Sequence, residues 1–143
     1  MNDLITSLIR STGSMFDLYL RTHAYHVNTT GKTFAQDHSF LKELYEEFND
    51  HFDTLAELVR INEGLIPIGV HSLVDLSTLP GTNENNDRGS NFRNLVLCID
   101  VILASLEGSR LVAQGQLATG TYIAIENIIV SLSNRKWMLI SSL

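Results

Sequence analysis

Apolar residues recur along this chain at the three- and four-residue spacing of helices, in four long stretches. These cover about residues 2–27, 33–62, 90–114 and 119–141. Hydrophobic side chains that return every three or four positions are the pattern of a helix with a buried face. The spacing therefore predicts an all-α chain.

The first and last connections between these stretches are short. About five residues, containing the turn Thr29-Thr30-Gly31, separate the first two predicted helices. A tight turn near residues 115–120 joins the last two. Short links make consecutive helices antiparallel neighbours, so we expect two helical hairpins.

The middle connection, residues 64–91, is long enough to run the length of a bundle. It contains both prolines of the chain and a polar loop at 81–87, and a short helix around 71–77 is expected inside it. Two hairpins joined by one long crossover form the ferritin-like four-helix bundle. At 143 residues, the chain is expected to form one such domain over residues 1–143.

The last two predicted helices are more apolar than a bundle made by one chain requires. Residues 122–130 are apolar almost all round the helix, and such a helix is buried on more than one side. We therefore expect a homo-oligomer in which a second subunit covers the additional face. A helix that is apolar by chance would instead aggregate.

Composition limits the compartment and the kind of partner. The net charge of -6 argues against a protein that binds nucleic acid by neutralising phosphates. No run of eighteen apolar residues is present and the first residues do not resemble a signal peptide, so we expect no membrane span and a cytoplasmic location. Cys98, inside the apolar run 95–99, is expected to be a buried small hydrophobe and not a nucleophile.

Four side chains carry metal-binding chemistry: His26, His38, Asp53 and Glu57. His26 ends the first predicted helix and His38 begins the second, so the hairpin brings them together. Asp53 and Glu57 lie within roughly 60–100° of His38 around the second helix, but roughly 23–29 Å further along its axis. The two pairs could share an ion only if the second helices of two subunits packed antiparallel across a twofold axis.

The positions of the histidines exclude a di-iron centre inside a single bundle. Such a centre needs a Glu-x-x-His pair on each of two helices, and no histidine follows His71. His23, one turn before His26, either supports or replaces one of the ligands, or it is a capped or packed histidine. His51 lies among acidic residues, where it either binds a surface metal or packs, and His71 is expected to be structural.

The spacing of the four candidate ligands resembles that of the Dps proteins, the miniature ferritins. The matching positions are His26-x4-Gly31-x2-Phe34-x3-His38, Asp53-x3-Glu57, Gly115-x3-Thr119 and Lys136-Trp137-Met138-Leu139. The resemblance covers nearly the whole chain and implies a ferritin-like four-helix bundle with a short helix in its crossover.

The resemblance also implies an assembly and an activity. A hollow dodecamer would oxidise Fe(II), typically with hydrogen peroxide, store ferric mineral and protect against oxidative stress. This ferroxidase site would combine His26 and His38 of one subunit with Asp53 and Glu57 of its neighbour, as both metal ligands and catalytic residues. Imidazole and carboxylate bind iron in both oxidation states.

Three departures from the family pattern argue against fast iron oxidation. Lys42 stands where the family usually has a carboxylate, one turn after the second histidine, and its ammonium would repel metal ions or pair with Asp53 or Glu57. Val27 stands beside the first histidine where the family commonly has tryptophan, so that aromatic electron donor is missing. No acid lies between residues 107 and 126, where the family's threefold iron channel is acidic.

These departures leave an alternative function open. The chain could be a ferritin-like self-assembling shell or structural component with a degenerate, inactive iron site. DNA binding is not expected, because the first base is Arg10 and no Lys-rich tail is present. A helical bundle unrelated to ferritins fits the periodicity but leaves the spacing of the four ligands unexplained.

Overall fold

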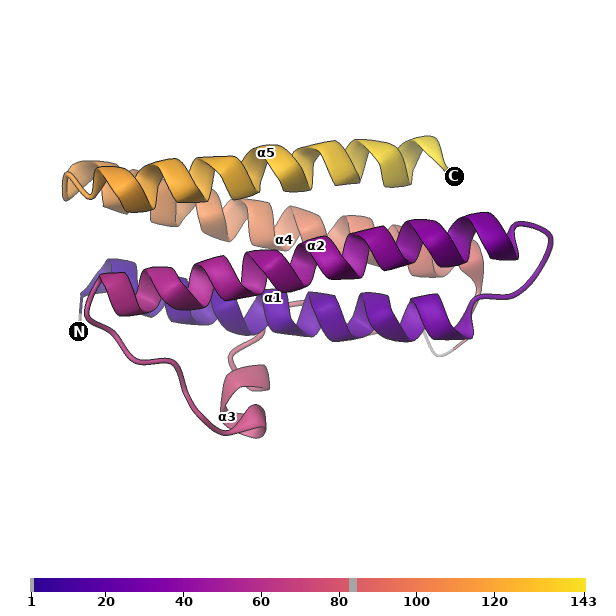
Figure 1. Cartoon of the computed structure of the whole chain (residues 1–143), viewed down its shortest axis with the longest axis horizontal. Helices are drawn as coiled ribbons and strands as arrows, with labels where there is room; N and C mark the ends of the chain where they lie inside the picture. The colour runs from indigo at the N-terminus through magenta and orange to yellow at the C-terminus, as the bar shows by residue number, and fades with distance from the viewer. Residues whose placement is uncertain (1, 83–84) are drawn as a thin grey trace.

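The computed structural model describes residues 2–82 and 85–143, and within these ranges it contains five helices. They are α1 (Asp3–Asn28), α2 (Phe34–Ile61), α3 (Val70–Val74), α4 (Arg88–Gly115) and α5 (Thr119–Ser141). The four long helices form a bundle, with α3 in the crossover between α2 and α4 (Figure 1). This confirms the predicted all-α architecture. Asn83 and Glu84, in the polar loop expected at 81–87, lie outside the described residues.

The long helices end within about two residues of the positions that the hydrophobic spacing predicts. The short crossover helix differs more, because it begins at Val70 and ends at Val74 rather than extending to residue 77. Both hairpins form as expected: α1 packs against α2 and α4 packs against α5. The first hairpin turns at Gly31, whose φ of 105° lies in the left-handed region that glycine adopts without strain.

The turn between α4 and α5 lies where expected but is not formed by its glycines. Gly115 ends α4 and Gly120 lies in the first turn of α5. Leu117 takes the left-handed conformation, with a φ of 58°. Its backbone N–H donates to the carbonyl oxygen of Gln114 at 3.1 Å.

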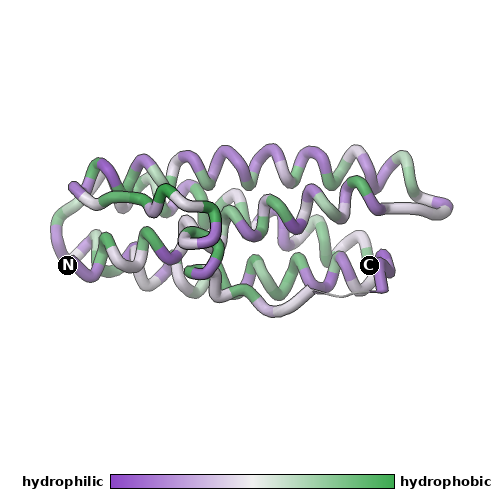
Figure 2. Tube along the Cα trace, turned by 90° about the horizontal axis from the view of Figure 1, so that it is seen from below, coloured by the Kyte–Doolittle hydropathy of each residue, from purple (hydrophilic) through white to green (hydrophobic). Residues whose placement is uncertain are grey.

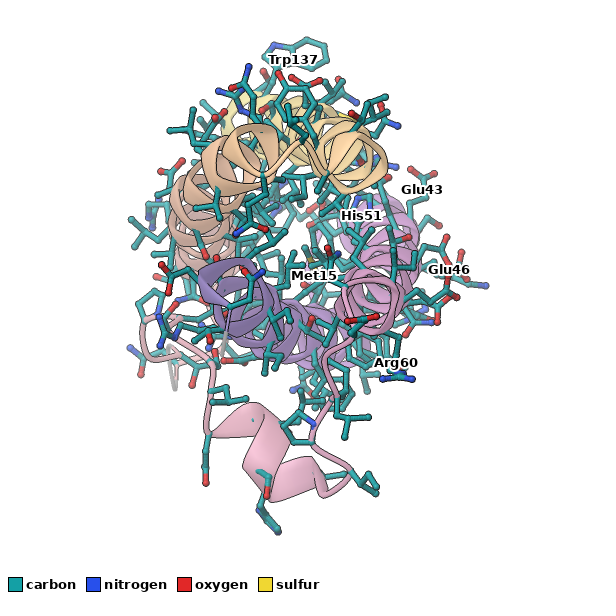
Figure 3. The ribbon with its side chains drawn as sticks, turned by 90° about the vertical axis from the view of Figure 1, so that its left-hand side faces the viewer. Met15, Glu43, Glu46, His51, Arg60 and Trp137 are labelled. Carbon is teal, nitrogen blue, oxygen red and sulfur yellow. The ribbon has the colours of Figure 1, made fainter. Side chains whose placement is uncertain are left out.

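The core lies between the four long helices. Apolar and polar positions alternate along each of them (Figure 2), and Met15 of α1 points into the centre of the bundle (Figure 3). Cys98 of α4 is fully buried, and burial raises the pKa of its thiol to about 11. The thiolate is therefore scarce at neutral pH, which fits its predicted role as a core residue.

A buried arginine ties the crossover to the bundle. Arg21 of α1 donates to the carbonyl oxygen of Pro80 at 2.7 Å and to the side-chain oxygen of Asn94 at 3.2 Å. It also forms an ion pair with Asp17 at 3.1 Å, one helical turn away. These contacts join the crossover to α1 and α4, and hydropathy gives no sign of them because a charged residue reads as exposed.

Several large apolar side chains remain on the surface. Ile61, Leu65 and Ile68 at the end of α2 and in the crossover are 69%, 73% and 102% exposed, respectively, and Val130 and Trp137 on α5 are also exposed. None of the helices in the described part of the chain is both long and apolar enough to cross a membrane.

Candidate metal centre

The first hairpin brings His26 and His38 into direct contact, as predicted. Their rings stack with centroids 3.7 Å apart and planes inclined by 16°. The Nδ1 atom of His26 lies 2.6 Å from the backbone oxygen of His38, and the Nδ1 atom of His38 lies 2.9 Å from the backbone oxygen of His26. The two residues are therefore joined by a reciprocal pair of hydrogen bonds.

These two hydrogen bonds determine which ring nitrogen can bind a metal. A carbonyl oxygen can only accept, so each Nδ1 must carry the proton and donate it. In a neutral imidazole the other nitrogen, Nε2, then has a free lone pair. A metal-binding histidine is usually held by such a bond from its second nitrogen.

The surroundings of His26 also keep it neutral. Burial lowers the pKa of His26, and although the bond to the backbone of His38 raises it, nearby His38, His23 and Lys42 lower it further. The net pKa lies below the ordinary value. Neutral imidazole is the form that binds metals.

Two further rings hold the histidine pair in place. Phe34 stacks on His38 with centroids 5.0 Å apart. Tyr45, one α2 turn beyond Leu41, meets His26 edge to face with centroids 5.2 Å apart. Aromatic packing on both sides restricts ring rotation, so the pair is preorganised.

Asp53 and Glu57 lie on α2 far from the histidine pair of their own chain. Because α2 is one continuous helix, the fifteen positions from His38 to Asp53 correspond to roughly 23 Å. Both acids are exposed. Within residues 2–82 and 85–143, no three His, Cys, Asp or Glu side chains lie close enough to hold a metal ion. One chain thus brings the histidines together but not the acids.

Lys42 lies on the surface one turn after His38. Its Nζ atom is 3.8 Å from an oxygen of Glu46, and both side chains are more than half exposed. Such a pair contributes little to stability and is easily exchanged for another. Whether Lys42 pairs with the acids of a neighbouring subunit stays a prediction.

His51 packs against α5. Its Nε2 atom lies 3.0 Å from the Ser131 hydroxyl and 3.6 Å from a carboxylate oxygen of Glu47, and Figure 3 shows it between α2 and α5. Burial lowers the pKa of His51, although Glu47 raises it. Glu47 in turn accepts a hydrogen bond from Arg135 at 2.8 Å. Of the two alternatives for His51, the structure shows the packed one.

His23 is also packed, and it lies beside residues that the sequence analysis did not select. Its ring is stacked on Tyr45 with centroids 4.1 Å apart and planes inclined by 2°. The Tyr19 hydroxyl lies 3.4 Å from its Nδ1 atom. The sequence does contain a sign that these rings lie near the histidine pair. Tyr19, His23 and His26 follow each other at helical spacing, and Tyr45 comes two turns after His38.

Comparisons with known proteins identify the family to which this chain belongs. The family model "Ferritin-like domain" matches residues 5–96, more than half of the chain. A DNA protection during starvation protein of Helicobacter pylori is 38% identical over 60 residues, 42% of this chain and 38% of that protein. One from Brevibacillus brevis is 40% identical over 52 residues, 36% and 35% of the two chains. The matched segments thus span well under half of these curated relatives.

Solved structures extend the likeness to the whole fold. Dps from Staphylococcus aureus superposes with a TM-score of 0.93 at 20% identity, covering 100% of this chain and 96% of that one. A Dps protein from Bacillus brevis gives 0.91 at 24% identity, covering 96% and 93%. The ferritin-like bundle, the short crossover helix and the sequence matches agree: the chain belongs to the ferritin-like superfamily and, within it, to the Dps family.

Proposed function

We propose that this chain is an iron-storage and protection protein that oxidises Fe(II) with hydrogen peroxide. Its ferroxidase site is shared by two subunits: His26 and His38 of one chain and Asp53 and Glu57 of its neighbour bind the iron. The observation that carries the proposal is the reciprocal hydrogen bonding of the two histidines, because it fixes both Nδ1 protons and leaves both Nε2 lone pairs for a metal.

The proposal requires a neighbouring subunit, and the surface offers a place for one. Ala56, Ile61 and Ile66 line an apolar surface patch that includes Glu57, on the half of α2 that also carries Asp53. Large exposed apolar patches favour protein–protein contact. Two copies of α2 that pack antiparallel near this patch would bring the acids of each chain to the histidines of the other.

Membership of the family supports an assembly and a compartment for this proposed protein. We propose that residues 1–143 act as one domain, that twelve copies form a hollow shell in the cytoplasm, and that the shell stores ferric mineral. Iron is the substrate: each Fe(II) loses one electron, and hydrogen peroxide takes two electrons and two protons to become two waters. Removal of iron and peroxide together prevents radical formation and so protects the cell.

The proposal is tested by anaerobic Fe(II) titration followed by peroxide, with ferric absorbance as the signal and light scattering as the measure of size. We expect a particle of about twelve chains that oxidises two Fe(II) per peroxide. A His26→Ala and His38→Ala double variant should keep the particle and lose oxidation. His71→Ala, on exposed α3, is the matched control.

The alternative function is a structural shell with an inactive site. The charge of Lys42, one turn after His38 and paired at 3.8 Å with exposed Glu46, favours this alternative. An intact particle that oxidises no Fe(II) above the background of buffer would support the shell and contradict the ferroxidase.

A further inference from the structure

We propose that Tyr19, paired with His23, is a redox-active tyrosine that supplies an electron to the His26–His38 site through Tyr45. This inference rests on the proposed iron oxidation, and it deepens it by naming a second electron source. The residue that follows His26 is Val27, which is not an aromatic electron donor. The packing of α1 against α2 places other aromatic rings there.

A continuous run of ring contacts leads away from the histidine pair, between α1 and α2. Tyr45 meets His26 with centroids 5.2 Å apart, and Tyr19 meets Tyr45 at 6.0 Å. His23 lies beside both tyrosines, 4.1 Å from the Tyr45 ring and 5.8 Å from the Tyr19 ring. Each ring centroid lies within 6.0 Å of the next, the range in which aromatic rings pack against each other, so electron transfer from Tyr19 to His26 needs only short steps.

The hydrogen bond to His23 is what distinguishes Tyr19 as the donor. A phenol that loses an electron becomes a strong acid, so its oxidation is much easier when a base is ready to take the proton. The Tyr19 hydroxyl lies 3.4 Å from Nδ1 of His23. With the His23 proton on Nε2, Nδ1 is the acceptor that this step requires.

The electron is needed because peroxide takes two electrons and a single Fe(II) supplies one. Lys42 adds a positive charge near the site, which disfavours a second bound cation. We infer the following balance. One Fe(II) becomes Fe(III), Tyr19 loses an electron and its phenol O–H bond breaks, and the proton passes to His23. Peroxide takes both electrons as its O–O bond breaks, and the two hydroxide ions that form take two protons from the buffered solvent to become two waters.

A second Fe(II) closes the cycle. It becomes Fe(III) as its electron reduces the neutral Tyr19 radical, and the proton returns from His23 to the phenol oxygen. The sum is two Fe(II) oxidised per peroxide, although the site holds one Fe(II) at a time. No reactive oxygen radical is released, because the second electron arrives from within the protein.

The test begins with particles loaded with one Fe(II) per subunit, mixed with peroxide and freeze-quenched for electron paramagnetic resonance. We expect a tyrosyl radical in the wild-type protein and its loss in Tyr19→Phe, which keeps the ring contacts and removes the hydroxyl. His23→Phe keeps a ring against Tyr45 and should also lose the signal. Tyr122→Phe is the matched control: its hydroxyl accepts from Arg110 on the α4–α5 side of the bundle, and the radical should persist.

A second arm uses no iron, so that it separates the two proposals. Metal-free particles are oxidised by a photogenerated ruthenium(III) tris-bipyridine complex. We expect a radical that Tyr19→Phe removes and that forms more slowly in deuterated water, because a proton moves with the electron. Tyr122→Phe should again leave it unchanged.

The outcomes are distinct. Wild-type particles that oxidise Fe(II) but show no radical in the first arm would overturn the tyrosine proposal and leave the ferroxidase standing. Particles that oxidise no Fe(II), yet form the Tyr19 radical with ruthenium, would overturn the ferroxidase and leave a redox-active Tyr19–His23 pair. A radical that survives Tyr19→Phe in both arms would overturn the assignment to Tyr19.

Discussion

A site divided between two subunits makes a quantitative prediction about mixed particles. One variant chain carries His26→Ala and His38→Ala, and the other carries Asp53→Ala and Glu57→Ala. Each forms inactive particles by itself, because each retains only half of every site. The halves lie roughly 23 Å apart along α2, so neither variant can rebuild a site within one chain.

Twofold symmetry sets how much activity a mixture regains. At such an interface each subunit gives its histidines to one site and its acids to the other. A pair of unlike variants therefore has one site with both halves intact and one site with both halves lost. When equal amounts assemble at random, half of the pairs are unlike, and about one quarter of the wild-type sites are restored.

The assay uses co-expression of the two variants with different affinity tags and purification over both tags in turn. Initial rates of ferric absorbance after addition of peroxide are compared with wild type at equal chain concentration. Separately assembled particles, mixed without subunit exchange, are the control and should stay at background. Co-assembled particles that remain as inactive as their parents, with both chains present by mass, would refute the shared site.

Three further predictions concern single residues. Asp37→Asn should lower the free energy of unfolding by about 1–3 kcal/mol, because buried Asp37 accepts charge-assisted hydrogen bonds from Arg88 at 2.7 and 3.2 Å. Urea unfolding at fixed protein concentration measures this change in stability. Burial raises the pKa of Asp37, but its hydrogen bonds lower it more, so the pKa in the folded protein lies below the ordinary value of 3.8. The stabilisation by Asp37 is therefore present above pH 3.8 and is lost as the pH falls through the lowered pKa. Asp37→Asn should lack that part of the pH dependence of stability. Gly13→Ala should lower the free energy of unfolding by about 1 kcal/mol, because its Cβ would stand 2.6 Å from a backbone oxygen of α3 and this clash outweighs the gain in helix propensity; an unchanged urea midpoint would contradict the packing. The Lys42→Asp protein should bind Fe(II) at least about fivefold more tightly than wild type, as about 1 kcal/mol of Coulomb energy predicts. Lys32→Asp, at an exposed position, is the control: an equal gain in Fe(II) affinity there would show that the effect comes from net charge and not from the position of Lys42.

The helices could be predicted from the sequence because hydrophobic periodicity depends on the chain alone. The features that the sequence did not reveal depend on three-dimensional packing. Leu117, and not a glycine, takes the left-handed turn before α5. Arg21 is buried because Asp17, Pro80 and Asn94 surround it, and these partners come from three parts of the chain.

In the candidate site, too, the positions of residues could be predicted from the sequence, whereas the contacts that depend on packing could not. The position of a turn between His26 and His38 suffices to predict that they meet, but their reciprocal hydrogen bonds depend on ring orientation, which spacing does not specify. Tyr19 and Tyr45 escaped selection because aromatic residues at helical spacing read as core. Asp53 could be assigned a partner only by assuming a second subunit, because fifteen positions of one continuous helix separate it from His38.

If each chain carries only half of the ligands of an iron site, iron oxidation would depend on assembly of the subunits. A lone subunit offers two imidazole nitrogens and no carboxylate, a set that binds Fe(II) weakly and does little to favour Fe(III). Because the backbone bonds of His26 and His38 preorganise these nitrogens before any partner arrives, the neighbour has only to supply Asp53 and Glu57. Oxidation would then begin only where two chains meet, so Fe(III) would form at an interface of the closed shell and not on free subunits.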